Sequence, residues 1–124
     1  MLSSVEYTDA LSIRRPQLSS VIFTDTPSLI LMKKFMFALN ASGHLHYEVT
    51  IQQLKQVAYL QVASTYWGAF ISGSTIKYRD GDVAEMGFML VDKKYRRQGL
   101  AEHMTQSRIN YAHHAGIKRL YAKV

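Results

Sequence analysis

The chain has 124 residues, of which 48% are hydrophobic, so it can bury one modest core and is expected to form a single domain over residues 1–124. It contains no cysteine, which excludes disulfide bonds and thiolate metal sites and favours a reducing compartment such as the cytoplasm. The formal net charge of +6 predicts an anionic ligand or partner. No membrane partner is expected, because no apolar run approaches the roughly 20 residues that cross a bilayer.

The N-terminal part predicts one strand and then a helix. Residues 5–8 and 18–23 are short β-like segments, and either is a candidate for the first strand. A helix is predicted after them, with Thr26 as N-cap and Pro27 at the first helical position. It is expected to run to about Asn40 and to end at the Ala-Ser-Gly sequence that follows.

This helix is apolar on nearly every side, which requires cover on more than one side. Self-association and burial within one chain remain open as explanations. The apolar residues are Leu29, Ile30, Leu31, Met32, Phe35, Met36, Phe37, Ala38 and Leu39.

The middle of the chain predicts a second helix and then strands. Thr50 and Gln53 have capping-box spacing, so the second helix is expected to start at Thr50. Strands are predicted at residues 59–63, 66–71 and 75–78, with Gly73 marking a bulge or turn. The Arg-Asp-Gly-Asp sequence that follows predicts a hairpin turn.

The next strand, predicted at residues 83–91, leads through a basic segment into a glycine-containing turn and a helix. The first N–H groups of a helix have no partner within the helix, and its dipole favours negative charge there. Gly99 permits close approach of a ligand to the backbone, while Arg96 and Arg97 add positive charge. The pattern predicts a binding site for a phosphorylated ligand.

The helix that starts at Gly99 is expected to pack one face on the sheet. Leu100, Met104, Tyr111 and Ala115 share that face. Arg108 lies close to the same arc, which an amphipathic pattern does not explain. A last strand is predicted at residues 120–124, beside the strand of residues 83–91.

The segment EMGFMLVDKKYRRQGLAEHM, followed by INYAHHAGIKRLYAKV, resembles the acetyl-CoA-binding core of the GNAT acetyltransferase superfamily. The family motif Arg/Gln-x-x-Gly-x-Gly/Ala corresponds here to Arg96, Gly99 and Ala101, and the close match covers residues 83–124. The resemblance implies an α/β (α+β) fold, with a mixed, mostly antiparallel sheet flanked by helices. The last helix and two strands usual in the family would be lacking, so either another chain completes the fold or the protein is a shortened relative.

The resemblance also implies where acetyl-CoA binds. The backbone of Met89, Leu90 and Val91 is expected to hydrogen-bond the pantetheine arm, which enters where the last two strands splay apart. The pyrophosphate is expected at the turn formed by Arg96, Arg97, Gln98, Gly99, Leu100 and Ala101. The alternative for the two arginines is a plain solvated turn.

Glu85 occupies the strand position where many relatives keep a glutamate that takes a proton from the attacking amine. Its alternative is a solvent-facing side chain beside the hairpin. Tyr111 and Tyr121 are weaker candidates for protonating the leaving thiolate, and the residue that serves as general acid stays open. Tyr95 is expected to be structural.

Metal binding is a minor hypothesis, because the histidines lack nearby cysteine or clustered carboxylates. They are His44, His46, His103, His113 and His114. The leading hypothesis is an acetyl-CoA-dependent N-acetyltransferase acting on an unidentified primary amine. The alternatives are a non-catalytic CoA-binding or structural subunit that oligomerises with itself or a partner chain, and a basic module that contacts RNA.

Overall fold

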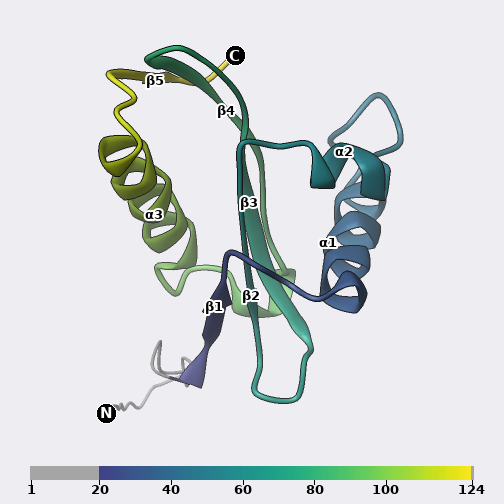
Figure 1. Ribbon diagram of the computed structural model, residues 1–124. Helices are drawn as coiled ribbons and strands as arrows, with labels where there is room; N and C mark the ends of the chain where they lie inside the picture. The colour runs from purple at the N-terminus through teal and green to yellow at the C-terminus, as the bar shows by residue number, and fades with distance from the viewer. Residues whose placement is uncertain (1–19, 124) are drawn as a thin grey trace.

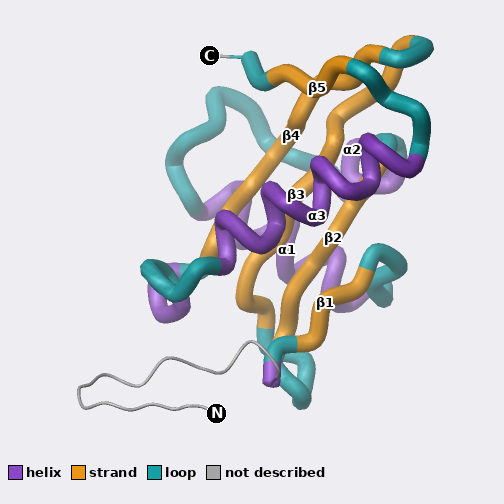
Figure 2. Tube along the Cα trace, turned by 90° about the vertical axis from the view of Figure 1, so that its left-hand side faces the viewer, coloured by secondary structure: helices purple, strands orange, loops and turns teal. Residues whose placement is uncertain are grey.

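The computed structural model describes residues 20–123 and places a five-stranded sheet between two layers of helix (Figure 1). The strands are β1 (Ile22–Thr24), β2 (Tyr59–Ser64), β3 (Phe70–Asp80), β4 (Val83–Val91) and β5 (Arg119–Tyr121). Helices α1 (Leu29–Ala41) and α2 (Ile51–Lys55) cover one face, while α3 (Leu100–His114) crosses the other (Figure 2). A short 3-10 helix, η2 (Lys93–Tyr95), lies between β4 and α3. The predicted fold class is confirmed.

The sheet has the order β1-β2-β3-β4-β5, and all neighbours are antiparallel except β4 and β5. The parallel pairing covers only Val83 to Glu85, opposite Arg119 to Tyr121. Within residues 20–123, the rest of β4 has β3 on one side and an open edge on the other. This open edge is the structural basis of the candidate site.

The first strand differs from its prediction. Of the predicted segment 18–23, only Ile22 and Phe23 belong to β1, which ends at Thr24. The other predicted segment, residues 5–8, lies outside the described residues.

Helix α1 begins later than predicted, because Ser28 and not Thr26 is its N-cap. The Ser28 hydroxyl accepts a hydrogen bond from Leu31 N at 3.2 Å, whereas Thr26 N donates to Thr24 Oγ1 in the preceding turn. The helix buries Phe35 and Leu39 against the sheet and leaves Ile30 and other apolar side chains exposed. Burial within the chain therefore covers only part of its apolar surface.

The predicted capping box of α2 is confirmed. Thr50 Oγ1 accepts from Gln53 N at 3.2 Å, and Thr50 N donates to Gln53 Oε1 at 2.8 Å. These two bonds satisfy backbone donors that would otherwise lack partners, which allows a helix of only five residues.

Gly73 is predicted to mark a bulge or turn between two strands, and the turn is absent, although the register with β4 shifts just after Gly73, between Ser74 and Ile76. Strand β3 runs continuously through Gly73, and the chain reverses earlier, at the turn that contains Tyr66, Trp67 and Gly68. A Cβ atom on Gly73 would lie 2.6 Å from the Phe35 ring. The glycine thus makes room for α1 to approach the sheet.

Helix α3 packs through a stripe of residues four apart, namely Leu100, Met104, Arg108 and Ala112. The predicted face shared its first two members but had Tyr111 and Ala115 in place of the others. Tyr111 is half-buried and stacks on Tyr59, with ring centroids 4.5 Å apart. Residues four apart lie on one face of a helix, and Arg108 is buried on this face together with the apolar residues. The prediction missed this because it sought apolar residues only.

Candidate acyl-CoA site

The turn between η2 and α3 contains two residues in the left-handed conformation. Gly99 has φ +81° and Arg97 has φ +64°, the only positive φ of a non-glycine residue among those the structure describes. The left-handed region costs a residue with a Cβ atom about 1–2 kcal/mol, so the strain at Arg97 indicates a functional constraint. Turns that include left-handed residues can direct successive N–H groups to one side and form a cradle for an anion.

The N-terminus of α3 opens at this turn without a side-chain cap. Gly99 is the N-cap, and no side chain within residues 20–123 accepts a hydrogen bond from the first N–H groups of the helix there. A Cβ atom on Gly99 would have its nearest neighbour, Glu102 Oε1, at 3.9 Å, so the space beside it is open. The uncapped N–H groups and the helix dipole are therefore available to an anionic ligand.

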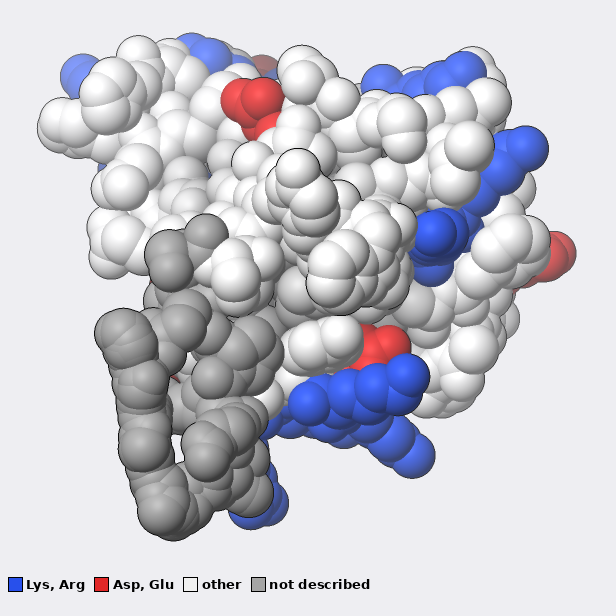
Figure 3. All heavy atoms as spheres, turned by 90° about the horizontal axis from the view of Figure 1, so that it is seen from below, with Lys and Arg blue, Asp and Glu red and all other residues white. Residues whose placement is uncertain are grey.

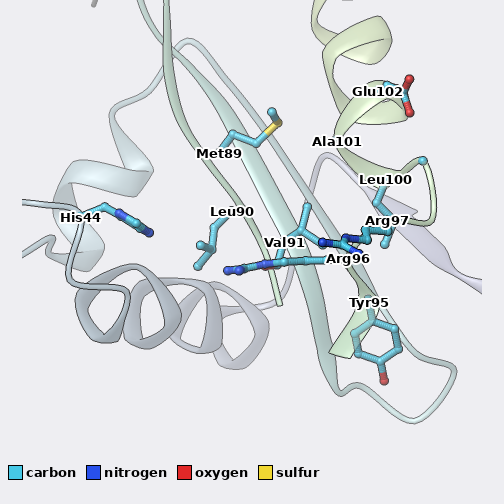
Figure 4. Close-up of a pocket in the computed structure, with 11 residues that line it drawn as sticks. His44, Met89, Leu90, Val91, Tyr95, Arg96, Arg97, Leu100, Ala101 and Glu102 are labelled. Carbon is cyan, nitrogen blue, oxygen red and sulfur yellow. The ribbon is translucent and has the colours of Figure 1, made fainter. Parts of the chain in front are cut away.

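A cavity of about 450 Å³ brings the turn together with the open edge of β4. Figure 4 shows its lining side chains, which come from the loop after α1, the end of β4, the turn and the start of α3. Every predicted cofactor-binding residue except Gln98 lines it. The lining residues are His44, Met89, Leu90, Val91, Tyr95, Arg96, Arg97, Gly99, Leu100, Ala101 and Glu102.

The charge around this cavity is mostly positive. Lys93, Lys94, Arg96 and Arg97 are all exposed in the segment that follows β4, and the molecule seen from below presents more Lys and Arg than acidic side chains (Figure 3). Arg96 donates to the Val91 carbonyl at 3.0 Å through Nε, so its two terminal nitrogens do not take part in this bond. The same bond occupies a carbonyl that the sequence assigns to the pantetheine arm.

Glu85 lies near the start of β4, where it is the last residue of β4 that pairs with β5. Its side chain is 3% exposed, and no described residue hydrogen-bonds its Oε1 atom. The solvent-facing alternative is therefore wrong. Met89 is four positions after Glu85 on β4, which corresponds to about 13 Å at the usual strand rise.

Two tyrosines flank Glu85 from the neighbouring strands. Tyr78 on β3 and Tyr121 on β5 are its register partners, and their hydroxyl oxygens lie 3.2 Å apart. The hydrogen bond with Tyr121 is the main reason that the pKa of the Tyr78 phenol is raised to about 12, and a hydrogen bond with Glu85 adds to it. Sequence reasoning did not connect Tyr78 with Glu85, because the contact depends on strand register.

Three lining residues were not assigned to the cofactor from the sequence. His44 stands in the loop from α1 to α2, which is tied to α1 by hydrogen bonds of 2.7 and 3.0 Å between the Asn40 side chain and the Val49 backbone. Tyr95 packs against a core cluster that includes Leu100. Glu102 directly follows the motif in the first turn of α3, so its place in the lining could have been predicted. The sequence around His44 contains no signal that would have predicted its place there.

The other sequence candidates lie apart from this cavity. Tyr111 donates to the Ala58 carbonyl at 3.3 Å, on the side of the sheet near β2. Among residues 20–123, no group of three or more His, Cys, Asp or Glu side chains is placed to hold a metal ion. No helix in the described part of the chain is long and apolar enough to cross a membrane.

Comparison with known proteins places these features in a family. Residues 30–124 match the model of the acetyltransferase (GNAT) family. No curated protein matches the chain.

Solved structures share the fold at low sequence identity. A GNAT family acetyltransferase from Staphylococcus aureus has a TM-score of 0.69 and 10% identity, covering 84% of this chain and 73% of that one. A GNAT family N-acetyltransferase from Escherichia coli, crystallised with CoA, has a TM-score of 0.64 and 18% identity, and the match covers 78% of this chain and 58% of that one. An aminoglycoside acetyltransferase from an uncultured soil metagenomic sample, crystallised with sisomicin, has a TM-score of 0.63 and 13% identity, and the match covers 86% of this chain and 78% of that one.

Proposed function

Because the chain belongs to the GNAT acetyltransferase family, whose members use acetyl-CoA, we propose that it transfers the acetyl group of acetyl-CoA to a primary amine. The observation that carries the proposal is the joining of three features in one cavity. These are the uncapped N-terminus of α3, the left-handed turn before it, and the open edge of β4. Together they fit a ligand with a pyrophosphate at one end and an amide-containing arm.

The cofactor would lie along β4 in a defined direction. Its pyrophosphate would accept hydrogen bonds from N–H groups of the turn and of α3, with Arg96 and Arg97 balancing the charge. The pantetheine amides would pair with the exposed backbone near Met89, as an added strand does. The thioester then falls between Met89 and Glu85, where β4 and β5 have separated.

Glu85 is the proposed base. Its Oε1 atom is buried and has no hydrogen-bond partner among the described residues, which supports a role in accepting a proton from the acceptor amine. The amine nitrogen attacks the thioester carbonyl carbon, a C–N bond forms, the C–S bond breaks, and CoA leaves as the thiolate. Tyr78 and Tyr121 lie beside Glu85 as its register partners on the neighbouring strands.

A thiol-release assay tests the transfer reaction. Acetyl-CoA is supplied with a panel of primary amines and N-terminal peptides, and free CoA is measured. We expect Glu85→Gln to slow release by on the order of 10² while CoA affinity stays within about twofold, because the amide cannot take the proton. Glu48→Gln, an exposed substitution of the same kind, is the control. An unchanged rate in Glu85→Gln would remove Glu85 from the mechanism.

Self-association is a second part of the proposal. Ile30 and Phe37 on α1 and Tyr66 and Trp67 in the turn before β3 are exposed, Trp67 to 84%. Lys34 Nζ donates to the Gly68 carbonyl at 2.8 Å, which joins α1 to that turn, so the four side chains belong to adjoining segments. A second copy of the chain would cover them.

A further inference from the structure

Arg108 is a buried cation that makes no hydrogen bond to an anion among the described residues. Its side chain is 3% exposed on the face of α3 that packs on the sheet. Its hydrogen-bond partners within residues 20–123 are the Thr75 carbonyl, Thr105 Oγ1 and Met89 Sδ, none of them a carboxylate, and its Nε atom has no partner. Burial lowers the pKa of this guanidinium, although an arginine keeps its charge in proteins. An unpaired buried charge is unfavourable, so its retention calls for an explanation.

Arg108 contacts the sheet where β3 and β4 shift their register. The pairing changes between Ser74 and Ile76, so Thr75 has no register partner on β4, although its Oγ1 donates to the Phe88 carbonyl at 3.5 Å. The Ile76 carbonyl accepts from Ala58 N on the β2 side, and carbonyl directions alternate along a strand, which directs the Thr75 carbonyl toward β4. Arg108 Nη1 donates to that carbonyl at 3.3 Å.

The guanidinium also stands behind the wall of the cavity. Arg108 Nη2 lies 3.4 Å from Met89 Sδ, and Met89 lines the cavity at the open edge of β4 (Figure 4). The register shift spans the part of β4 between Met86 and Met89, opposite Ser74 to Ile76. The proposed function places the thioester in this same part of β4, between Met89 and the base Glu85.

We propose that Arg108 supplies the positive charge that balances the negative charge arising at the reacting end of bound acetyl-CoA. The inference rests on the proposed function. When the amine attacks, the carbonyl oxygen gains negative charge, and when the C–S bond breaks its electron pair remains on sulfur. Both atoms lie near the open edge of β4, and a fixed cation in a water-poor interior acts over several ångströms. Arg108 keeps its own protons throughout and acts from behind Met89.

Two CoA thioethers of equal shape and different charge test this role without an acceptor amine. S-carboxymethyl-CoA carries an anion where the acetyl group would lie, and S-carbamoylmethyl-CoA carries a neutral amide there. Calorimetric titration gives the affinity ratio of the two analogues for each variant. We expect Arg108→Met to lower the relative preference for the anionic analogue by about tenfold, and Arg108→Lys to retain most of it. Arg119→Met, which removes an exposed cation on β5, should change the ratio by less than about twofold.

The comparison between variants cancels the constant repulsion from Glu85. A purely structural role for Arg108 predicts that both analogues weaken together, and an equal ratio in the wild type and Arg108→Met would overturn the proposal. If neither analogue binds the wild type, the proposed function fails instead. Circular dichroism reports folding, and if Arg108→Met does not fold, Arg108→Gln replaces it with the same expected loss of preference.

Discussion

Glu85 and its two tyrosines show how a strand register creates chemistry at single residues. Tyr78 and Glu85 face each other across the β3–β4 hairpin, and Tyr121, distant in the sequence, pairs with Glu85 from β5. Tyr78 shares a hydrogen bond with Tyr121 and lies beside the Glu85 carboxylate, and both neighbours raise the pKa of its phenol. The surroundings of the proposed base thus include residues outside the family motif.

The raised pKa of Tyr78 predicts how stability changes in alkali. An unfolded chain releases this proton at the ordinary pKa of 10.0, whereas the folded protein keeps it until about pH 12. The contribution of this proton to stability is therefore complete below pH 10 and is lost as pH rises through 12. Tyr121→Phe removes the main cause, and the Tyr78 pKa should fall toward 10.0.

Near-ultraviolet phenolate absorbance measures this titration, and the difference between wild type and Tyr78→Phe assigns it. Tyr47→Phe, in an exposed loop, is the control. A Tyr78 phenol that titrates identically with and without Tyr121 would show that the pair is not hydrogen-bonded in solution.

At the scale of elements, local signals could be predicted and tertiary ones could not. The capping box at Thr50 and the entry from β4 into α3 depend on neighbouring residues, so the sequence contains the whole signal. The N-cap of α1 was misplaced because Thr26 and Ser28 are both good caps. Nothing local chooses between them. Strand β3 is continuous because Gly73 pairs with Val62 on β2 and Leu90 on β4, and a sequence pattern does not reveal this pairing or the contact of Gly73 with Phe35.

That contact makes a prediction about α1 and β3. Gly73→Ala would place a methyl group against the Phe35 ring, so we expect a loss of about 1–3 kcal/mol in the free energy of unfolding. In a Phe35→Leu background the same substitution should be milder, because the ring is gone. Denaturant unfolding of the four proteins in the cycle measures the coupling. An equal loss in both backgrounds would mean that the helix does not rest on Gly73.

Likewise, the residues of the candidate site that are neighbours in the sequence could be predicted, and those brought in by tertiary contacts could not. The turn and the β4 backbone follow one another in the chain, so the motif and its family resemblance predicted nearly all of the cavity lining contributed by these segments. His44 comes to the cavity from the loop after α1, and Arg108, two turns along α3, contacts the lining residue Met89. Arg108 was noticed as an exception to the amphipathic pattern, but only the register shift at Thr75 explains its burial.

At the scale of the whole molecule, the exposed apolar side chains predict that the protein is not a monomer. Light scattering with size exclusion should give at least twice the 14.2 kDa chain mass. Phe37→Asp or Trp67→Asp should lower that mass, because each puts a charge into the proposed contact. Ile109→Asp, on α3 across the sheet, is the matched control (Figure 2). Phe35, equally apolar in sequence, is unsuitable because it is buried. A wild-type protein that stays monomeric at micromolar concentration would contradict the proposal.

The central claim is that CoA binds at the turn before α3, and isothermal titration with CoA tests it most directly. Gly99→Glu adds bulk and negative charge where the pyrophosphate would lie. Gly68→Glu is the control, because Gly68 also has a positive φ, +89°, and a Cβ there meets nothing within 4 Å. We predict that the wild type and Gly68→Glu bind CoA alike, and that Gly99→Glu binds at least about tenfold more weakly, roughly 1.4 kcal/mol. Equal binding by all three proteins, or no binding by the wild type, would contradict the assignment.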